Sequence, residues 1–243
     1  ALRITEQIAA RDSMQVDMNN GTGWPFGGPW VPLSEGACKA VFVDTVVSKS
    51  VKADKIDFAV PQKERPYSRL SAVRTFPTGE KGKQRVIALF IGRTRQKVKR
   101  AAPGGEGWVI DHFDKNAVKH YLTHIDSAFA ASATPYPTTF FNDSYEVYGA
   151  NWTPTLADEF EKRRGYSLLD NLDKLLDGDA KVVGDYRETL SDMLYENFTL
   201  QWTAWAHSHG VVVRNQAHGS PANLLDLYAA VDIPEIEGFG LSD

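Results

Sequence analysis

The feature that most constrains this fold is a repeated order of short apolar strand, polar strand end and helix. Such alternation favours parallel strands joined by right-handed crossovers. The carboxyl ends of parallel strands lie at one edge of a sheet, so polar residues at those ends are expected to meet in one cleft. The polar strand ends are Asp17 with Asn19, Asp111 with His112, Asp143 with Glu146, Arg214 with Asn215 and His218, and Glu235 with Glu237.

The pattern of apolar runs, helical periods and turn residues divides the chain into three predicted regions. Residues 1–35 hold a helix, a strand and a glycine-rich aromatic loop, and 108–243 continue the strand and helix rhythm. Between them, 36–107 contain short β-like runs separated by Lys, Gly and Pro, which predicts a β-rich insertion. We therefore expect an α/β protein with one insertion.

Composition excludes several classes of function. The 243 residues are 42% hydrophobic with a formal net charge of -4, which gives no general drive toward nucleic acid or anionic membrane. The basic run Arg93–Arg100 alternates as an exposed strand would and is interpreted as a solvated face. No apolar stretch approaches the roughly 18 residues of a membrane helix. The first residues show no signal-peptide pattern, so we expect a removed leader or a piece of a longer chain.

Carboxylates, amides and partly exposed aromatic rings at one edge suit glycoside hydrolysis. That chemistry needs one protonated carboxyl to give its proton to the leaving oxygen and a second carboxylate to activate water or to attack. We assign Glu146 as the general acid, because Tyr145 and Tyr148 can desolvate it and a negative Asp143 nearby favours its protonated form. Asp143 is then a supporting carboxylate. The alternative for this segment is an ordinary acidic turn.

The segment GTGWPFGGPW at 21–30 is glycine-rich but lacks the Lys-Ser/Thr of a phosphate-binding loop and the context of a dinucleotide site. Its rings, Trp24 among them, are interpreted as a rigid aromatic wall of a sugar site. A purely structural loop is the alternative.

Glu235 and Glu237 alternate along an extended segment, so only one of them easily faces the cleft. Their oxygens can hold Ca²⁺, and the alternative is a solvated acidic loop. His120 and His124 have zinc-ligand spacing, but without HExxH they are assigned to a solvated helix. His218 follows an apolar strand and is interpreted as a substrate contact. Of Arg214 and Asn215, one is expected to brace the sheet.

Several long segments carry a resemblance to a known family. The segments SMQVDMNNGTGWPFGGP, APGGEGWVIDHF, FFNDSYEVYG, DYRETLSDMLYENFTLQWTAWAHSHG and RNQAHGSPANLLDLYAAVDIPEIEGFG together resemble the α-L-rhamnosidases of glycoside hydrolase family 106. The resemblance spans 13–30 and about 104–240.

The resemblance implies a (β/α)8 TIM-barrel catalytic domain, incomplete in this chain, in a bacterial enzyme that is periplasmic or secreted. It implies cleavage of terminal α-L-rhamnose with inversion, a bound Ca²⁺ and a rhamnose-containing carbohydrate as substrate. Net charge and hydropathy lead us to expect neither nucleic acid nor membrane as a partner. Glu146 matches the family's acid and Asp143 a nearby essential carboxylate, while Glu235 and Glu237 match calcium or substrate positions. The resemblance also assigns sugar contacts to the GTGWPFGGP loop, with Trp24, and to RNQAHG, with Arg214, Asn215 and His218. Asp17, Asn19 and Asp111 are expected to be further substrate contacts because they lie at the polar strand ends of the same cleft.

The sequence departs from the family pattern because it lacks the later Ser-Ser-Glu-type segment that carries the proposed general base. We therefore expect other segments of a longer chain to complete the barrel. Two rivals stay open at this point. One is a non-catalytic rhamnose-binding module, and the other is a retaining glycosidase of related fold.

Overall fold

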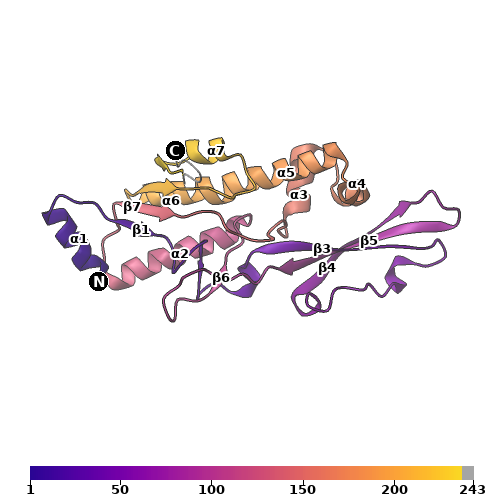
Figure 1. Cartoon of the computed structure of the whole chain (residues 1–243), viewed down its shortest axis with the longest axis horizontal. Coiled ribbons are helices and arrows are strands. Elements are labelled where there is room, and N and C mark those ends of the chain that lie inside the picture. Colours follow the sequence, from indigo (N-terminus) through magenta and orange to yellow (C-terminus); the bar gives the residue numbers. More distant parts are fainter. Residues whose placement is uncertain (237–243) are drawn as a thin grey trace, which may run out of the picture. The chain divides into compact units, whose positions relative to one another are not determined.

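The computed structural model describes residues 1–236, and its contacts divide the chain into two compact units (Figure 1). The first unit comprises Ala1–Ala37, Arg95–Tyr148 and the described residues from Ser191 on. The second comprises Cys38–Thr94 and Gly149–Leu190. The predicted ranges 1–35, 36–107 and 108–243 are each continuous, whereas both observed units are assembled from separated stretches.

The first unit is built on a parallel sheet. Within residues 1–236 this sheet has four strands in the order β1-β7-β8-β9, and every neighbouring pair is parallel. The predicted parallel arrangement of these strands is confirmed, but the described residues do not form a complete barrel. The strands are β1 (Asp17–Asn19), β7 (Thr139–Asn142), β8 (Val212–Asn215) and β9 (Ile233–Pro234).

The register of the sheet separates its two faces. Met18, Phe140 and Val213 are aligned across β1, β7 and β8, and Phe140 and Val213 are fully buried. Because side chains alternate along a strand, Phe141 and Arg214 point to the opposite face. The sheet therefore has one core face and one face that carries charged side chains.

Helices of the first unit cover the core face. Helix α2 (Lys115–Ser132) is capped at its N-terminus by Asp114, whose carboxylate accepts hydrogen bonds from the backbone N–H groups of Asn116 and Ala117. The ring of Phe140 lies 5.0 Å from Trp205 of α6 (Gln201–Ser208) and 6.1 Å from Phe129 of α2, measured between centroids. The remaining helices of this unit are α1 (Leu2–Arg11) and α7 (Leu224–Ala229).

One strand lies where the sequence did not place it. The segment that ends at Asp111 and His112 was expected in the parallel sheet, but its strand β6 (Trp108–Val109) pairs antiparallel with β2 (Gly27–Gly28). Glycine explains this pairing, because a Cβ on Gly27 would lie 2.3 Å from the carbonyl oxygen of Trp108. The prediction was wrong because it treated every polar strand end alike.

The second unit contains the predicted β-rich segment as a three-stranded antiparallel sheet in the order β3-β5-β4. Its strands are β3 (Cys38–Ser48), β4 (Ser68–Pro77) and β5 (Lys83–Arg93). The run KIDFAV at 55–60 was also expected to be a strand, but it forms none.

Helices α3 (Leu156–Arg164), α4 (Leu172–Asp177) and most of α5 (Ala180–Leu194) also belong to the second unit. Arg85 of β5 forms ion pairs with Asp44 of β3 and Asp177 of α4, which fastens a helix to the sheet. The expected long helix from 185 to 210 continues from α5 through a π-helical segment, Tyr195–Leu200, into α6. Within residues 1–236, no helix is both long enough and apolar enough to span a membrane.

Replacing Phe140 with Ala tests the core face of the parallel sheet. Phe140→Ala is expected to lower the free energy of unfolding by about 3–5 kcal/mol, because it empties a fully buried site between two helices. Denaturant unfolding measures this loss, with Phe141→Ala as the matched control. Phe141 is only partly buried, so an equal loss in both variants would contradict the assignment of faces.

Candidate functional site

Two loops meet at the carboxyl edge of the parallel sheet, as the sequence analysis predicted. One follows β7 and carries Asp143 and Glu146, and the other follows β8 and carries His218. The backbone N–H of Tyr145 donates to the carbonyl oxygen of His218 at 2.7 Å, and the N–H of Gln216 donates to that of Asn142 at 3.1 Å. The two loops are therefore fastened side by side.

Gly219 allows the close approach of these loops. Its φ of +80° lies in the left-handed region, and a Cβ at this position would lie 2.7 Å from the carbonyl oxygen of Tyr145. A side chain here would both strain the backbone and push the two loops apart.

An ion triad spans the charged face of the sheet. Arg214 of β8 contacts Asp17 of β1 at 2.6 Å and Glu235, which follows β9, at 3.1 Å. Its guanidinium also lies 5.2 Å from the ring centre of Phe141. Three of the predicted site residues are thus brought together, with one more negative than positive charge among them.

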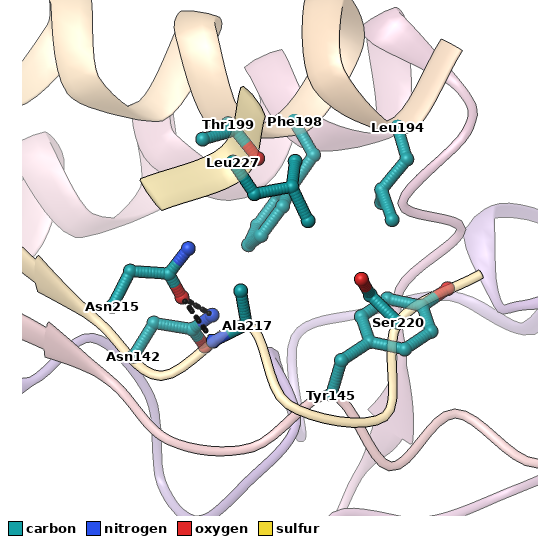
Figure 2. A pocket seen from close by; sticks show the side chains of 9 residues that line it. All are labelled: Asn142, Tyr145, Leu194, Phe198, Thr199, Asn215, Ala217, Ser220 and Leu227. Carbon is teal, nitrogen blue, oxygen red and sulfur yellow. Dashed lines mark hydrogen bonds between the residues drawn. The ribbon is translucent and has the colours of Figure 1, made fainter. Parts of the chain in front are cut away.

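Asn215 points to the opposite face from Arg214 and braces the sheet. Its side chain is 1% exposed, and its Oδ1 accepts hydrogen bonds from Nδ2 of Asn142 at 2.8 Å and from the N–H of Ala217 at 3.2 Å. Figure 2 shows this amide pair beside a hollow of about 10 Å³, roughly the space of one water. The hollow is lined by Asn142, Tyr145, Leu194, Phe198, Thr199, Asn215, Ala217, Ser220 and Leu227.

Sequence reasoning missed the contribution of the π-helical segment to this hollow. Phe198 and Thr199 lie in that segment, and π-helical turns occur frequently at functional sites. Tyr145 and Ser220 also line this hollow, and their hydroxyl groups have no hydrogen-bond partner among the described residues.

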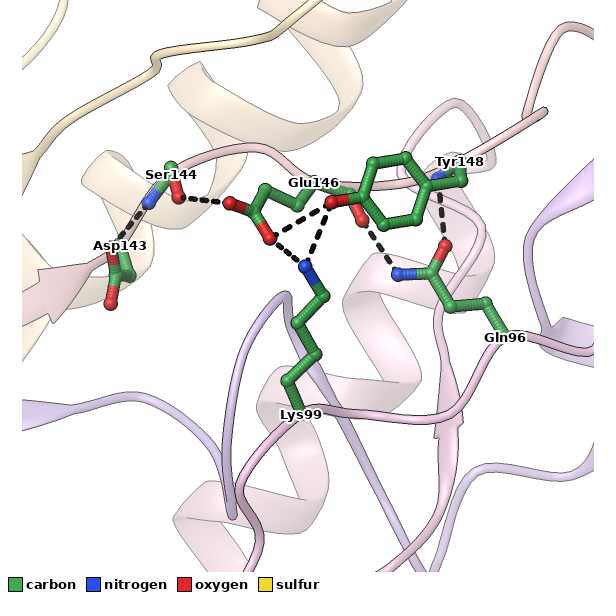
Figure 3. A network of polar contacts seen from close by, with 6 residues as sticks. All are labelled: Gln96, Lys99, Asp143, Ser144, Glu146 and Tyr148. Atoms are coloured by element: carbon green, nitrogen blue, oxygen red, sulfur yellow. Dashed lines mark hydrogen bonds and ion pairs between the residues drawn. The ribbon is translucent and has the colours of Figure 1, made fainter.

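Glu146 is held by a network of polar contacts, drawn in Figure 3. Its Oε1 accepts from Ser144 Oγ at 3.3 Å, and its Oε2 accepts from Tyr148 Oη at 3.2 Å and pairs with the ammonium of Lys99. Asp143 is turned away, with its Oδ1 accepting from the N–H of Ser144 at 2.7 Å. The neighbour of Glu146 is therefore a cation, where the sequence analysis expected the influence of Asp143.

Lys99 belongs to the basic run that was interpreted as a solvated face. That interpretation is wrong for Gln96, Val98 and Lys99, because Val98 is 8% exposed and backbone hydrogen bonds join the segment to both Trp24 and β6. Lys97 and Arg100 are exposed, as predicted. Alternation of charged and apolar residues fits an exposed strand and a strand between two neighbours equally well. The sequence held no local signal that could distinguish them.

The other predicted contacts lie in different surroundings. Trp24 is bonded through its backbone to Lys99, and its ring lies 5.3 Å from the guanidinium of Arg100. Asn19 ends β1 and is partly exposed, and the side chain of His218 is exposed. Asp111 is 1% exposed and accepts from the N–H of Phe113 at 3.1 Å. Glu237 lies outside the described residues.

His112 is buried beneath the rim. It is 2% exposed, its Nδ1 lies 3.0 Å from the carbonyl oxygen of Ile110, and its ring contacts Phe198 and Tyr145 at 4.6 and 5.2 Å. Burial lowers the pKa of His112 to about 3, so it is neutral at ordinary pH. Burial also raises the pKa of Tyr145, and the nearby charge of Asp111 acts in the same direction.

His120 and His124 are both exposed on α2, as predicted for a solvated helix, and each has a neighbouring side chain. His120 pairs with Glu35 at 2.8 Å, and the ring of His124 stacks on Trp30 with centroids 4.3 Å apart. Both line a second hollow of about 170 Å³ next to Tyr121.

The described residues do not by themselves form the expected calcium site. Across residues 1–236, no three His, Cys, Asp or Glu side chains are arranged to hold a metal ion. Asp17 and Glu235 are both paired with Arg214. The assignment of Ca²⁺ to Glu235 and Glu237 stays a prediction.

Comparisons with known proteins place these features in context. The model of glycoside hydrolase family 106, described as alpha-L-rhamnosidase, matches residues 75–236. The solved structure of a rhamnosidase from Novosphingobium sp. PP1Y is similar, with a TM-score of 0.57 and 25% identity, over 64% of this chain and 16% of that one.

A protein of Formosa agariphila named "Putative beta-glucuronidase" is 29% identical over 164 residues, which are 63% of this chain and 14% of that protein. The chain thus spans 14% of the length of the Formosa relative and 16% of the Novosphingobium rhamnosidase.

Gly219→Ala is expected to lower the free energy of unfolding by about 2–3 kcal/mol, because the new methyl group meets the carbonyl of Tyr145. Gly210→Ala is the matched control, since Gly210 also has a positive φ but no atom within 4 Å of an added Cβ. That control is expected to lose about 1 kcal/mol. Denaturant unfolding compares the two, and equal losses would refute the close approach.

The burial of His112 predicts a dependence of stability on pH. Its folded pKa of about 3 lies below the unfolded value of about 6.5, so between these values the unfolded chain binds a proton that the folded chain does not. The contribution of neutral His112 to the free energy of unfolding is complete above about pH 6.5. It falls toward pH 3, with a slope of up to about 1.4 kcal/mol per pH unit. His112→Phe should flatten this slope in denaturant titrations. An unchanged slope would show that His112 is not the group responsible.

Proposed function

The chain belongs to glycoside hydrolase family 106, the α-L-rhamnosidases, and on that premise we propose that it forms part of the catalytic region of an enzyme that hydrolyses terminal α-L-rhamnosides. The single observation that carries the proposal is the family match over residues 75–236, which includes the loops after β7 and β8. We further propose that the four parallel strands are part of a (β/α)8 barrel, whose active sites lie at the carboxyl ends of the strands.

In this proposal Glu146 is the general acid. It lies in the loop after β7, its side chain is 32% exposed, and three neighbouring side chains fix its carboxylate. It gives its proton to the glycosidic oxygen as the bond to the anomeric carbon breaks. Hydrolysis with inversion needs a second carboxylate about 6.5–9.5 Å away to activate water. We assign that base to a residue outside 1–236, because Glu235 is engaged with Arg214 and Gln216.

The name of the Formosa relative suggests a glucuronide as a second candidate substrate. A glucuronide carries a carboxylate, which an unpaired Arg would attract. Arg214 is already paired with Asp17 and Glu235, and the triad keeps an excess negative charge that repels an acidic sugar. These contacts favour a neutral sugar such as rhamnose.

Calcium assistance remains part of the proposal, with Glu237 as its candidate ligand. Oxygen ligands suit Ca²⁺, and a bound ion of that kind would help to orient sugar hydroxyls. The steps assigned to Glu146 do not depend on it.

Glu146→Gln in the full-length protein tests the acid role. It is expected to lower kcat by about 10²–10⁴-fold on alkyl rhamnosides, whose poor leaving groups need protonation. Nitrophenyl rhamnosides leave as stable anions, so they should lose far less. The control is Glu80→Gln, in the hairpin between β4 and β5. Near-normal turnover of alkyl rhamnosides would remove Glu146 from this role.

Proton NMR of the first-formed sugar tests the outcome of the same reaction. Release of β-L-rhamnose supports inversion, whereas α-L-rhamnose would indicate a retaining enzyme. Release of glucuronate alone would replace the proposed substrate. Binding of rhamnose without any turnover would favour a carbohydrate-binding module.

A further inference from the structure

We propose that Gln96 and Lys99 are positioning residues that set the orientation of Glu146 and select which of its oxygens carries the proton. This inference rests on the proposed function. It goes beyond that function because it assigns a task to a basic segment that the acid role alone does not use.

Gln96 fixes the backbone at Glu146 and just after it. Its Nε2 donates to the carbonyl oxygen of Glu146 at 2.6 Å, and its Oε1 accepts from the N–H of Tyr148 at 2.7 Å. The side-chain amide thus bonds to the loop as a neighbouring strand would. These two bonds hold the loop backbone at Glu146, so they fix the point from which its side chain projects.

Lys99 and Tyr148 distinguish the two carboxyl oxygens of Glu146. Both contact Oε2, and Lys99 Nζ also lies 2.8 Å from Tyr148 Oη and 4.6 Å from the centre of its ring. Among the contacts of the described residues, Oε1 has the longer one to Ser144 Oγ at 3.3 Å. A protonated carboxyl has one donor oxygen and one acceptor oxygen. An ammonium donates hydrogen bonds and cannot accept one, so Oε2 beside Lys99 must be the acceptor oxygen. The acidic proton is therefore directed to Oε1.

The same ammonium helps when the proton leaves. As Oε1 transfers its proton to the glycosidic oxygen, Glu146 becomes a carboxylate and the electron pair of the broken bond remains on the leaving oxygen. The charge that develops on Glu146 lies beside Lys99, which is already in position to stabilise it. Lys99 therefore acts on the reaction through Glu146 and does not need to touch the sugar.

The position of Lys99 is fixed from both sides of its segment. On one side, Lys99 and Trp24 exchange backbone hydrogen bonds at 2.8 and 3.4 Å. A Cβ on Gly23 would lie 2.1 Å from the carbonyl oxygen of Lys99, so this approach requires glycine. On the other side, the N–H of Val98 donates to Gly107, and the N–H of Val109 donates to Gln96, both at 3.0 Å. The glycine-rich aromatic loop thus contributes by holding Lys99.

The test compares variants of the full-length protein on alkyl and nitrophenyl glycosides of whichever sugar the wild type hydrolyses. Lys99→Met is expected to lower kcat on the alkyl glycoside by about 10–10³-fold, with KM nearly unchanged and a much smaller loss on the nitrophenyl glycoside. Lys99→Arg should restore part of the lost activity. Lys97→Met is the matched control, because exposed Lys97 contacts Trp108 and not Glu146.

A double mutant separates positioning from a general structural role. In the Glu146→Gln background, Lys99→Met should cause little further loss, because the residue through which it acts is already gone. Gln96→Leu gives a second variant with the same expected pattern if Lys99→Met folds poorly by circular dichroism. Equal losses on both glycosides, or a full additional loss in the Glu146→Gln background, would overturn the inference. A wild type that hydrolyses no glycoside would overturn the proposed function and this inference with it.

Discussion

The parallel pairing of β7 with β8 is the constraint on which the rim depends. With Phe140 aligned to Val213 and Asn142 to Asn215, both strands end together and their loops emerge at one edge. The hydrogen bond from Tyr145 to His218 then needs no long connection. The same register directs apolar side chains to the helices and leaves Arg214 on the other face, where it binds carboxylates that arrive from β1 and from the segment after β9. The register of β7 and β8 thus determines both the packing of the core face and the ion pairs of Arg214.

Three glycines at this rim matter because they have no side chain. Gly23, Gly27 and Gly219 each lie where a methyl group would meet a backbone carbonyl of another segment at less than 3 Å. In each case the neighbour belongs to a segment near the candidate site. The glycine-rich loop at 21–30 therefore contributes to the candidate site through its backbone. It brings backbones close enough to hydrogen-bond, and Lys99 and β6 depend on that closeness.

Much of the architecture could be predicted from the sequence, because strand pattern and polar strand ends are local signals. The rim around Glu146 and His218, and the triad residues Asp17, Arg214 and Glu235, were all found in this way. Lys99 was missed because its contact with Glu146 joins residues 47 positions apart, and no local pattern records such a pairing. The burial of Asp111 and His112 was missed for a related reason, since their strand end looks like the others and differs only in its glycine partner. The roles of the site residues themselves remain predictions.

The alternation along β8 has a consequence for how this strand can change in evolution. Arg214 faces the carboxylates and Asn215, its neighbour in sequence, is fully enclosed against Asn142. Inserting or deleting one residue within the strand would exchange these two surroundings, sending a guanidinium into an apolar interior and an amide to the charged surface. A conservative substitution at Val213 disturbs the structure far less than such a one-residue shift. The length of this short strand should therefore vary less among related proteins than the identity of its aliphatic residues.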